Sequence, residues 1–126
     1  MTVRAGDRLP YAEIAAPLAD PSASVYAWLA APGFHVLLLQ REREGLEARA
    51  SASTWAAQLE RACPGWFHVH AVASGQGADA LFDALGVTGR AMVLVRPDQY
   101  IACVDDRIES PVLEAWLERT LGLRIA

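Results

Sequence analysis

Short continuous apolar runs alternate along this chain with segments whose apolar positions recur at helical spacing. Runs rich in β-branched, aromatic and aliphatic residues favour strands, especially where turn-forming residues bound them. These runs predict strands at Val25–Leu29, Phe34–Gln40, Trp66–Ala73, Met92–Val95 and Tyr100–Val104. The last two are separated by Pro97-Asp98, which provides turn chemistry, so they are expected to form an antiparallel hairpin.

The segment before the third strand predicts an amphipathic helix. Its N-cap is expected at Ser51 or Ser53, and Pro64-Gly65 ends the pattern. Its apolar stripe follows i, i+4, i+7 and i+8 spacing and contains Trp55, Leu59, Ala62 and Cys63. The preceding charged stretch Arg41–Ala50 is expected to be a surface loop or a frayed helix start.

Two further helices are predicted nearer the C-terminus. Asp79–Leu85 is followed by Gly86, which is typical of a helix C-cap. The final helix is expected to have Ser110 as N-cap and Pro111 at its first position, and to end at Gly122. Its apolar stripe contains Leu113, Trp116, Leu117 and Leu121.

The order of elements from Phe34 onward is β-α-β-α-β-β-α. Helix-linked strands are followed by an antiparallel terminal hairpin, which is the element order of the thioredoxin fold. We expect an α/β, thioredoxin-like domain whose central mixed sheet carries helices on both faces. Residues 1–126 are expected to form a single domain, with an N-terminal extension at 1–24 and a core at 25–126.

Composition argues against several classes of function. The chain has 126 residues and a net charge of -4, so it lacks the basic surface that binding to nucleic acid requires. The longest apolar stretch, near Phe34–Leu39, is too short to span a bilayer, and the N-terminus has no apolar signal-peptide core. We therefore expect a cytoplasmic protein without nucleic-acid or membrane partners.

Three phrases of the sequence resemble those of a known family. The hairpin phrase LVRPDQYIA, the segment Gly6–Pro10 and the strand Gly33–Leu38 are similar to phrases in the C-terminal domain of FAD-dependent aromatic hydroxylases, the phenol hydroxylase and polyketide hydroxylase group. The resemblance implies a thioredoxin-like accessory domain remote from the flavin. It also implies that FAD and NAD(P)H are bound only within a larger monooxygenase, and not by this domain alone.

The resemblance also marks individual residues. The family usually has glycine where Gln99 stands, so Gln99 is expected to adopt a positive φ. Arg96 and Asp98 are expected to brace the turn through side-chain to backbone bonds. The structural or interface candidates are Arg8, Pro10, Arg96, Pro97, Asp98 and Tyr100.

A thioredoxin-like fold raises the question of thiol chemistry. Disulfide exchange needs a reactive thiolate at the start of the first helix after the strand, with a partner cysteine close by. Here the strand Phe34–Gln40 is followed by Arg41-Glu42-Arg43-Glu44 without a cysteine, and Cys63 and Cys103 are forty residues apart. We expect both thiols to be reduced and packed, and the domain to be redox-inactive.

A competing motif, G-x-G-x-x-A, lies at Gly75–Ala80 between a predicted strand and a predicted helix. Together with Asp98, this layout could hold a dinucleotide, with the pyrophosphate at the helix N-terminus and the ribose on the acid. Gly75, Gly77 and Asp98 are therefore candidates for cofactor binding. A plain strand-to-helix turn explains the same residues, because the helix is short and few residues follow Asp98.

His68 and His70 are two positions apart, so both side chains lie on one face of their strand, where two imidazoles can bind a metal ion. No third ligand is evident near them in the sequence, and hydrogen bonding or solvent exposure explains strand histidines equally. His35 is expected to reach solvent or to form a core hydrogen bond. We expect no metal site and no catalytic residue.

These expectations favour a non-catalytic accessory domain that acts in structure, oligomerisation or partner docking, with a second copy or a larger flavoprotein as its partner. One alternative is a fragment or subunit of an FAD- and NAD(P)H-dependent oxygenase that acts on an aromatic or polyketide substrate. A second alternative is a small-molecule or nucleotide-binding module that uses the Gly75–Ala80 turn.

Overall fold

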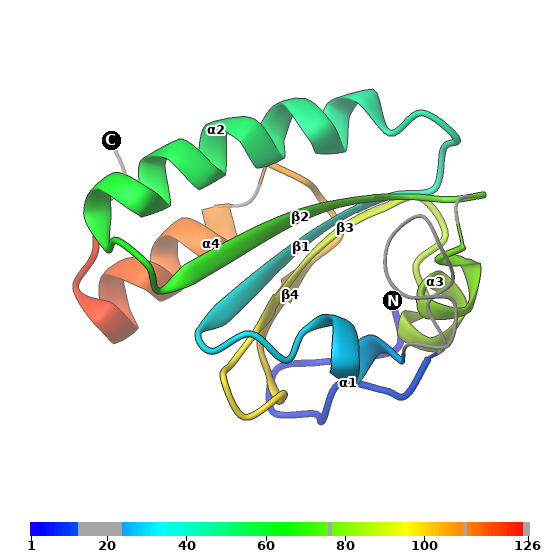
Figure 1. Ribbon diagram of the computed structural model, residues 1–126, viewed down its shortest axis with the longest axis horizontal. Coiled ribbons are helices and arrows are strands. Elements are labelled where there is room, and N and C mark those ends of the chain that lie inside the picture. Colours follow the sequence, from blue (N-terminus) through cyan, green and yellow to red (C-terminus); the bar gives the residue numbers. More distant parts are fainter. Residues whose placement is uncertain (13–23, 76, 110, 125–126) are drawn as a thin grey trace.

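The computed structural model describes residues 1–12, 24–75, 77–109 and 111–124. They form a four-stranded sheet with helices on both faces (Figure 1). The strands are β1 (Phe34–Gln40), β2 (Phe67–Ala73), β3 (Arg90–Val95) and β4 (Ile101–Asp105). The helices are α1 (Val25–Trp28), α2 (Leu46–Ala62), α3 (Asp79–Leu85) and α4 (Pro111–Trp116), and α4 continues as the π-helical turn η1 (Leu117–Leu121).

The strand order in the sheet is β2-β1-β3-β4. β1 pairs parallel with β2 and antiparallel with β3, while β3 and β4 form the predicted antiparallel hairpin. From β1 onward the elements follow the predicted β-α-β-α-β-β-α order. The prediction of a mixed α/β fold with helices on both faces of the sheet is confirmed. Among the described residues, no helix combines the length and apolar character that crossing a bilayer requires.

Alternate side chains of β1 enter two hydrophobic cores. Leu37 and Leu39 belong to the core on the side of α1 and α3, and Val36 and Leu38 belong to the core on the side of α2 and α4 (Figure 1). Both faces of β1 are consequently covered. This explains why its sequence is a continuous apolar run and does not alternate with polar residues.

The prediction of a strand at Val25–Leu29 is wrong, because this segment forms α1 and the turn after it. Val25 and Leu29 are both buried, and the Leu29 N–H donates to the Val25 carbonyl at 3.0 Å. The valine, tyrosine and tryptophan of the segment favour strands. Burial of the side chains at i and i+4 against the core overrides that preference.

Helix α2 begins several residues before the predicted N-cap at Ser51 or Ser53, so that prediction is also wrong. Gly45 takes the N-cap position in a left-handed conformation, with φ 59°. The buried Gln40 side chain at the end of β1 accepts a hydrogen bond from the Ala48 N–H at 3.0 Å. A residue from the preceding strand therefore satisfies an amide of the first helical turn, a contact that local sequence cannot show.

The predicted ends of the later helices are mostly confirmed. Gly86 and Gly122 both adopt the left-handed C-cap conformation, with φ 71° and 68°. Leu121 is 39% exposed, so its predicted place on the buried stripe is wrong. The wider π-helical turn changes the angular spacing of the side chains and places Leu121 outside the stripe. The predicted N-cap Ser110 lies outside the described residues.

Candidate functional site

The structure brings most of the predicted interface candidates together at the hairpin end of the sheet. The N-terminal segment 6–9 lies alongside the start of β4. The Gly6 N–H donates to the Ile101 carbonyl at 2.8 Å, and the Ile101 N–H donates to the Asp7 carbonyl at 2.7 Å. Arg8 and Tyr100 form an isolated antiparallel bridge between the two segments. Segment 6–9 therefore covers this part of the β4 edge.

Arg8 lies against two tyrosine rings. Its guanidinium carbon is 5.2 Å from the ring centroid of Tyr26 and 5.9 Å from that of Tyr100. Arg96 approaches the Tyr100 ring at the same 5.9 Å distance, so Tyr100 is shared by two cations. Hydrogen bonds with Tyr26 and Tyr100 raise the pKa of Arg8 above its ordinary value. We call Arg8, Tyr26, Arg96, Asp98 and Tyr100 the Arg8 cluster.

The hairpin tip is braced partly as the sequence predicted: the Asp98 side chain bonds to the backbone, whereas the Arg96 side chain bonds to Asp98. The Asp98 carboxylate pairs with the Arg96 guanidinium and accepts a hydrogen bond from the Tyr100 N–H at 3.1 Å. Pro97 is exposed at the tip, and Pro10 is half-buried. The predicted positive φ of Gln99 is confirmed at 66°.

The Gln99 side chain adds a contact that the sequence did not show. Its Nε2 donates to the Tyr26 carbonyl at 3.0 Å. Gln99→Ala should lower the free energy of unfolding by about 1 kcal/mol, because the backbone strain stays and this bond is lost. Gln99→Gly should stay within about 0.5 kcal/mol of the wild type, because relief of strain offsets the lost bond. Urea unfolding of both variants measures the difference; equal losses would show that the positive φ carries no strain.

The candidate cofactor residues are not brought together. Gly75 follows β2 at the end of the sheet where Gln40 pairs with Ala73, and Asp98 follows β3 at the end where His35 pairs with Val95. These are opposite ends of β1. The structure therefore separates the glycine turn from the acid that would hold a ribose.

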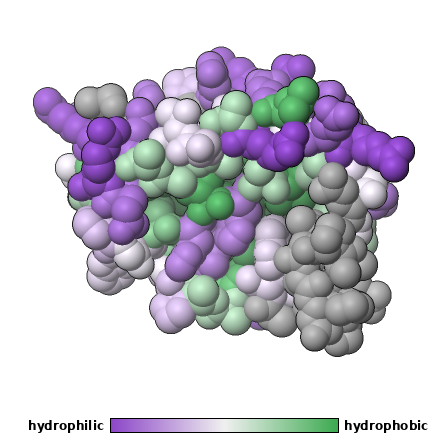
Figure 2. Space-filling model, turned by 45° about the horizontal axis from the view of Figure 1, so that its top comes forward, coloured by the Kyte–Doolittle hydropathy of each residue, from purple (hydrophilic) through white to green (hydrophobic). Residues whose placement is uncertain are grey.

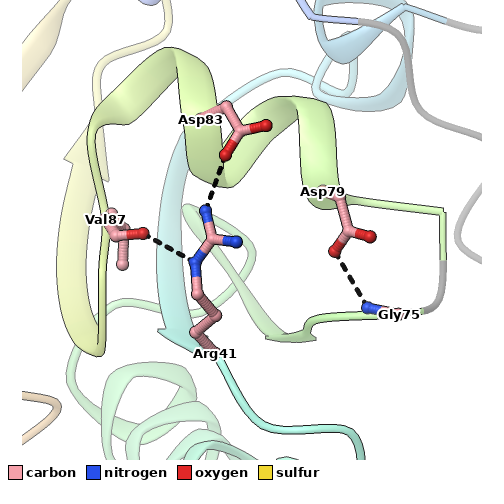
Figure 3. Close-up of polar contacts among 5 residues, drawn as sticks. All are labelled: Arg41, Gly75, Asp79, Asp83 and Val87. Atoms are coloured by element: carbon pink, nitrogen blue, oxygen red, sulfur yellow. Dashed lines mark hydrogen bonds and ion pairs between the residues drawn. The ribbon is translucent and has the colours of Figure 1, made fainter.

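The carboxylate of Asp79, the first residue of α3, lies at the start of this helix. Asp79 Oδ1 accepts a hydrogen bond from the Gly75 N–H at 2.9 Å (Figure 3). The same figure shows Arg41 holding the other end of the helix, with bonds to Asp83 at 2.8 Å and to the Val87 carbonyl at 2.9 Å. A phosphate at this turn would meet the Asp79 charge, so the geometry favours a plain turn. Gly77 has φ 85°, and the motif residue Gln76 lies outside the described residues.

Three histidines meet on the α1 side of the sheet. The register pairs His35 with His68, and the stacked rings have centroids 4.8 Å apart. His35 and His70 also stack, at 5.2 Å, with His35 Nδ1 and His70 Nε2 2.9 Å apart. Trp28 of α1 lies against the His70 ring at a centroid distance of 4.8 Å. The sequence predicted that His68 and His70 lie on one face of their strand. It did not predict that His35 joins them, because that depends on the β1–β2 register.

Hydrogen bonds assign the protons of this cluster. The Ala31 carbonyl can only accept, so His35 Nε2 donates to it at 2.8 Å. In neutral His35, Nδ1 is then free to accept the His70 Nε2–H. His68 Nε2 donates to the Pro32 carbonyl at 2.9 Å. The three rings thereby tie the turn after α1 to the sheet.

The surroundings of His35 and His70 favour the neutral forms of these two rings. Burial, helped by the neighbouring His35 and His68, lowers the pKa of His70 to about 4, and burial also lowers the pKa of His35. Within residues 1–12, 24–75, 77–109 and 111–124, no group of three or more histidine, cysteine or carboxylate side chains is arranged to hold a metal ion.

The two cysteines are in different environments. Cys63 is half-buried at the C-cap of α2, and Cys103 is buried in β4. Burial and the neighbouring Asp105 raise the pKa of Cys103 to about 12. Such a thiol is almost entirely protonated at neutral pH and reacts slowly.

A groove between α2 and the start of α4 was not predicted from the sequence. Its volume is about 510 Å³, and Trp55 contributes to its lining. Thr54 and Gln58 line it from α2, and Glu109 and Glu114 line it from the segment around the start of α4. Only the packing of two helices distant in sequence reveals it.

Comparisons with known proteins agree with this fold. A family model described as aromatic-ring hydroxylase, C-terminal, matches residues 2–123. A search of curated protein sequences found no significant match. Among solved structures, the fold is similar to that of aklavinone-11 hydroxylase in a ternary complex with FAD and aklavinone, with a TM-score of 0.61 and 22% sequence identity. The likeness covers 91% of this chain and 21% of the hydroxylase chain, so this chain spans about a fifth of that protein's length.

Proposed function

The chain belongs to the aromatic-ring hydroxylase C-terminal family, and we propose that it is a non-catalytic, redox-inactive accessory domain of an FAD-dependent aromatic hydroxylase. Its role is structural, in oligomerisation or in docking to the flavoprotein body. The observation that carries the proposal is the extent of the match. It includes residues 2–123 of this chain, while the similar hydroxylase has a chain about four times as long.

We propose that the rest of such a hydroxylase, outside this domain, binds FAD, NAD(P)H and the aromatic or polyketide substrate. The Gly75–Ala80 turn is a poor dinucleotide site, since α3 has seven residues and Asp79 already accepts the Gly75 N–H. A fragment or subunit of an oxygenase remains the alternative, because the likeness includes only 21% of the hydroxylase chain. In that case catalysis belongs to the complete assembly.

Two features support a redox-inactive role. The turn after β1, where a thioredoxin-like enzyme would carry its nucleophile, has the sequence Arg41-Glu42-Arg43-Glu44. The buried Cys103 has a pKa raised to about 12, and Cys63 caps the far end of α2. Neither thiol is placed at the start of a helix, where the backbone amides would stabilise a thiolate.

The proposal predicts that the isolated chain binds neither FAD nor NADPH in equilibrium dialysis and does not catalyse insulin reduction. Two results would contradict it: stoichiometric dinucleotide binding that Gly77→Val abolishes, or insulin reduction that Cys63→Ser abolishes. A positive test uses the flavoprotein body of an FAD-dependent aromatic hydroxylase, expressed with and without this chain. Flavin content per body should be equal, and thermal stability or assembly should be greater with the chain present.

A further inference from the structure

The two edges of the sheet are treated differently. At the β4 edge, segment 6–9 pairs with the strand start, and the Leu9 N–H donates to the Gln99 carbonyl at 2.9 Å. β2 forms the other edge, with β1 as its one neighbour in the sheet. In the part of the chain that the structure describes, no segment pairs with the outer side of β2.

The backbone groups that β2 presents outward can be identified. The Phe34 N–H donates to the Trp66 carbonyl at 2.8 Å, and the Ser74 N–H donates to the Gln40 carbonyl at 3.3 Å. Along a strand of a parallel pair, residues that hydrogen-bond to the neighbouring strand alternate with residues whose N–H and C=O groups point away from it. These two bonds therefore show which residues of β2 bond to β1. The even-numbered residues of β2 bond to β1. The N–H and C=O groups of Phe67, Val69 and Ala71 therefore point away from the sheet.

β2 also lacks the features that usually protect an edge. Its sequence, FHVHAVA, has no charged residue, proline or glycine, and its first five residues are all half-buried. Natural sheets commonly protect such edges with charges, proline, bulges or a covering segment. Figure 2 shows hydrophobic residues interspersed with hydrophilic ones across the middle of the viewed face. Phe67, Val69 and Ala71 of β2 are partly buried against the core that α2 covers. An edge of this kind is suited to pairing with another strand.

We propose that the β2 edge binds the β2 edge of a second copy of this chain, in antiparallel pairing centred on Val69. In this register Val69 faces Val69 of the second copy, and Phe67 faces Ala71. The backbone N–H and C=O groups of all three residues point outward from the sheet, so each facing pair exchanges backbone hydrogen bonds across a two-fold axis. The two four-stranded sheets then form one continuous sheet.

The side chains of β2 are compatible with this partner. The half-buried run Phe67–Ala71 is centred on Val69, as a symmetric contact requires. His68 faces His70 of the second copy, and burial lowers the pKa of His70 to about 4, so this pair brings no like charges together at neutral pH. A partner strand that contained charged residues or proline would form a less favourable pairing with this uncharged edge.

Sedimentation equilibrium of the 126-residue chain tests the proposal. The wild type should dimerise in the micromolar range. Val69→Lys puts two like charges opposite each other and should weaken the dimer at least about tenfold. Ala71→Lys puts a charge opposite Phe67 of the second copy, should also weaken the dimer, and provides a second variant if Val69→Lys unfolds. The matched control is Thr54→Lys, which adds the same charge on the exposed part of α2 that lines the groove, and should leave the dimer unchanged.

Cysteine cross-linking tests the register. Facing residues in a hydrogen-bonded antiparallel pair have Cα atoms about 5.5 Å apart, within the range of a disulfide. In a Cys63→Ser background, Val69→Cys should give a covalent dimer on mild oxidation, whereas Thr54→Cys should not. A monomeric wild type, a dimer that survives both lysine variants, or a Val69→Cys variant that does not cross-link would each overturn the proposal.

This inference rests on the oligomerisation role within the proposed function, but the two fail differently. Dinucleotide binding or thiol activity would refute the proposed function and leave the sedimentation result to be interpreted on its own. A monomer without either activity would refute only the β2 contact.

Discussion

Gly33→Ala is expected to lower the free energy of unfolding by about 3 to 5 kcal/mol. Gly33 has φ 116°, a conformation that side chains rarely adopt, and a Cβ there would lie 2.6 Å from the Trp66 carbonyl oxygen. That oxygen accepts the Phe34 N–H, the first bond between β1 and β2. To relieve the clash, the backbone at the start of the β1–β2 pairing would have to move. Urea unfolding followed by circular dichroism measures the loss.

Two other glycines separate the causes. Gly65 has φ 80°, and a Cβ added there would meet open space, so Gly65→Ala should cost about 1 kcal/mol from strain alone. Gly89 lacks a positive φ and also has open space, so Gly89→Ala should stay within about 0.5 kcal/mol of the wild type. A Gly33→Ala loss no larger than that of Gly65→Ala would show that the clash with Trp66 is relieved at little cost.

Acidification should destabilise the protein through its histidine cluster. The pKa of His70 is lowered from 6.5 to about 4 in the folded state. The unfolded state therefore binds its proton first, and stability falls as the pH drops from about 6.5 towards 4. Since His70 is only partly buried, we expect a loss of about 1 to 3 kcal/mol by the lower end of this window. Well above pH 6.5 the ring is neutral in both states and contributes no pH dependence.

His70→Gln is the matched variant for this effect. Glutamine does not titrate, and its side-chain amide can still donate to His35 Nδ1. Urea unfolding between about pH 7 and about pH 5 should give a smaller slope for the variant than for the wild type. A residual slope is expected, because the pKa of His35 is also lowered. Identical slopes would mean that His70 does not drive the acid sensitivity.

Sequence reasoning worked best where the signal was local. The helix Asp79–Leu85, the strand Phe34–Gln40 and the hairpin around Pro97 each have a pattern and a terminator within a few residues, and the structure confirms them. The prediction of a strand at Val25–Leu29 was wrong because five consecutive apolar residues fit both the strand and the helix periodicity. Only burial of Val25 and Leu29 in the core favours the helix. The start of α2 failed because Gln40, from the preceding strand, supplies the cap.

The candidate sites show the same division. Arg8, Arg96 and Tyr100 were selected by their family phrases, but their meeting depends on the pairing of segment 6–9 with the start of β4. The sequence also placed His68 and His70 together. It could not add His35, because strand register is a property of the sheet as a whole.

The pairing of segment 6–9 with the start of β4 has a consequence for the folding order. The hydrogen bonds between Gly6, Asp7 and Ile101 close a loop of more than ninety residues, whereas the β3–β4 hairpin closes within a few. Closing a long loop costs more chain entropy, and it becomes favourable only after the intervening elements have formed a surface to close against. We therefore expect the N-terminal segment to join a nearly complete sheet late in folding. Until it pairs, the folding chain exposes both sheet edges, so we expect folding molecules at high concentration to be most vulnerable to mispairing during that interval.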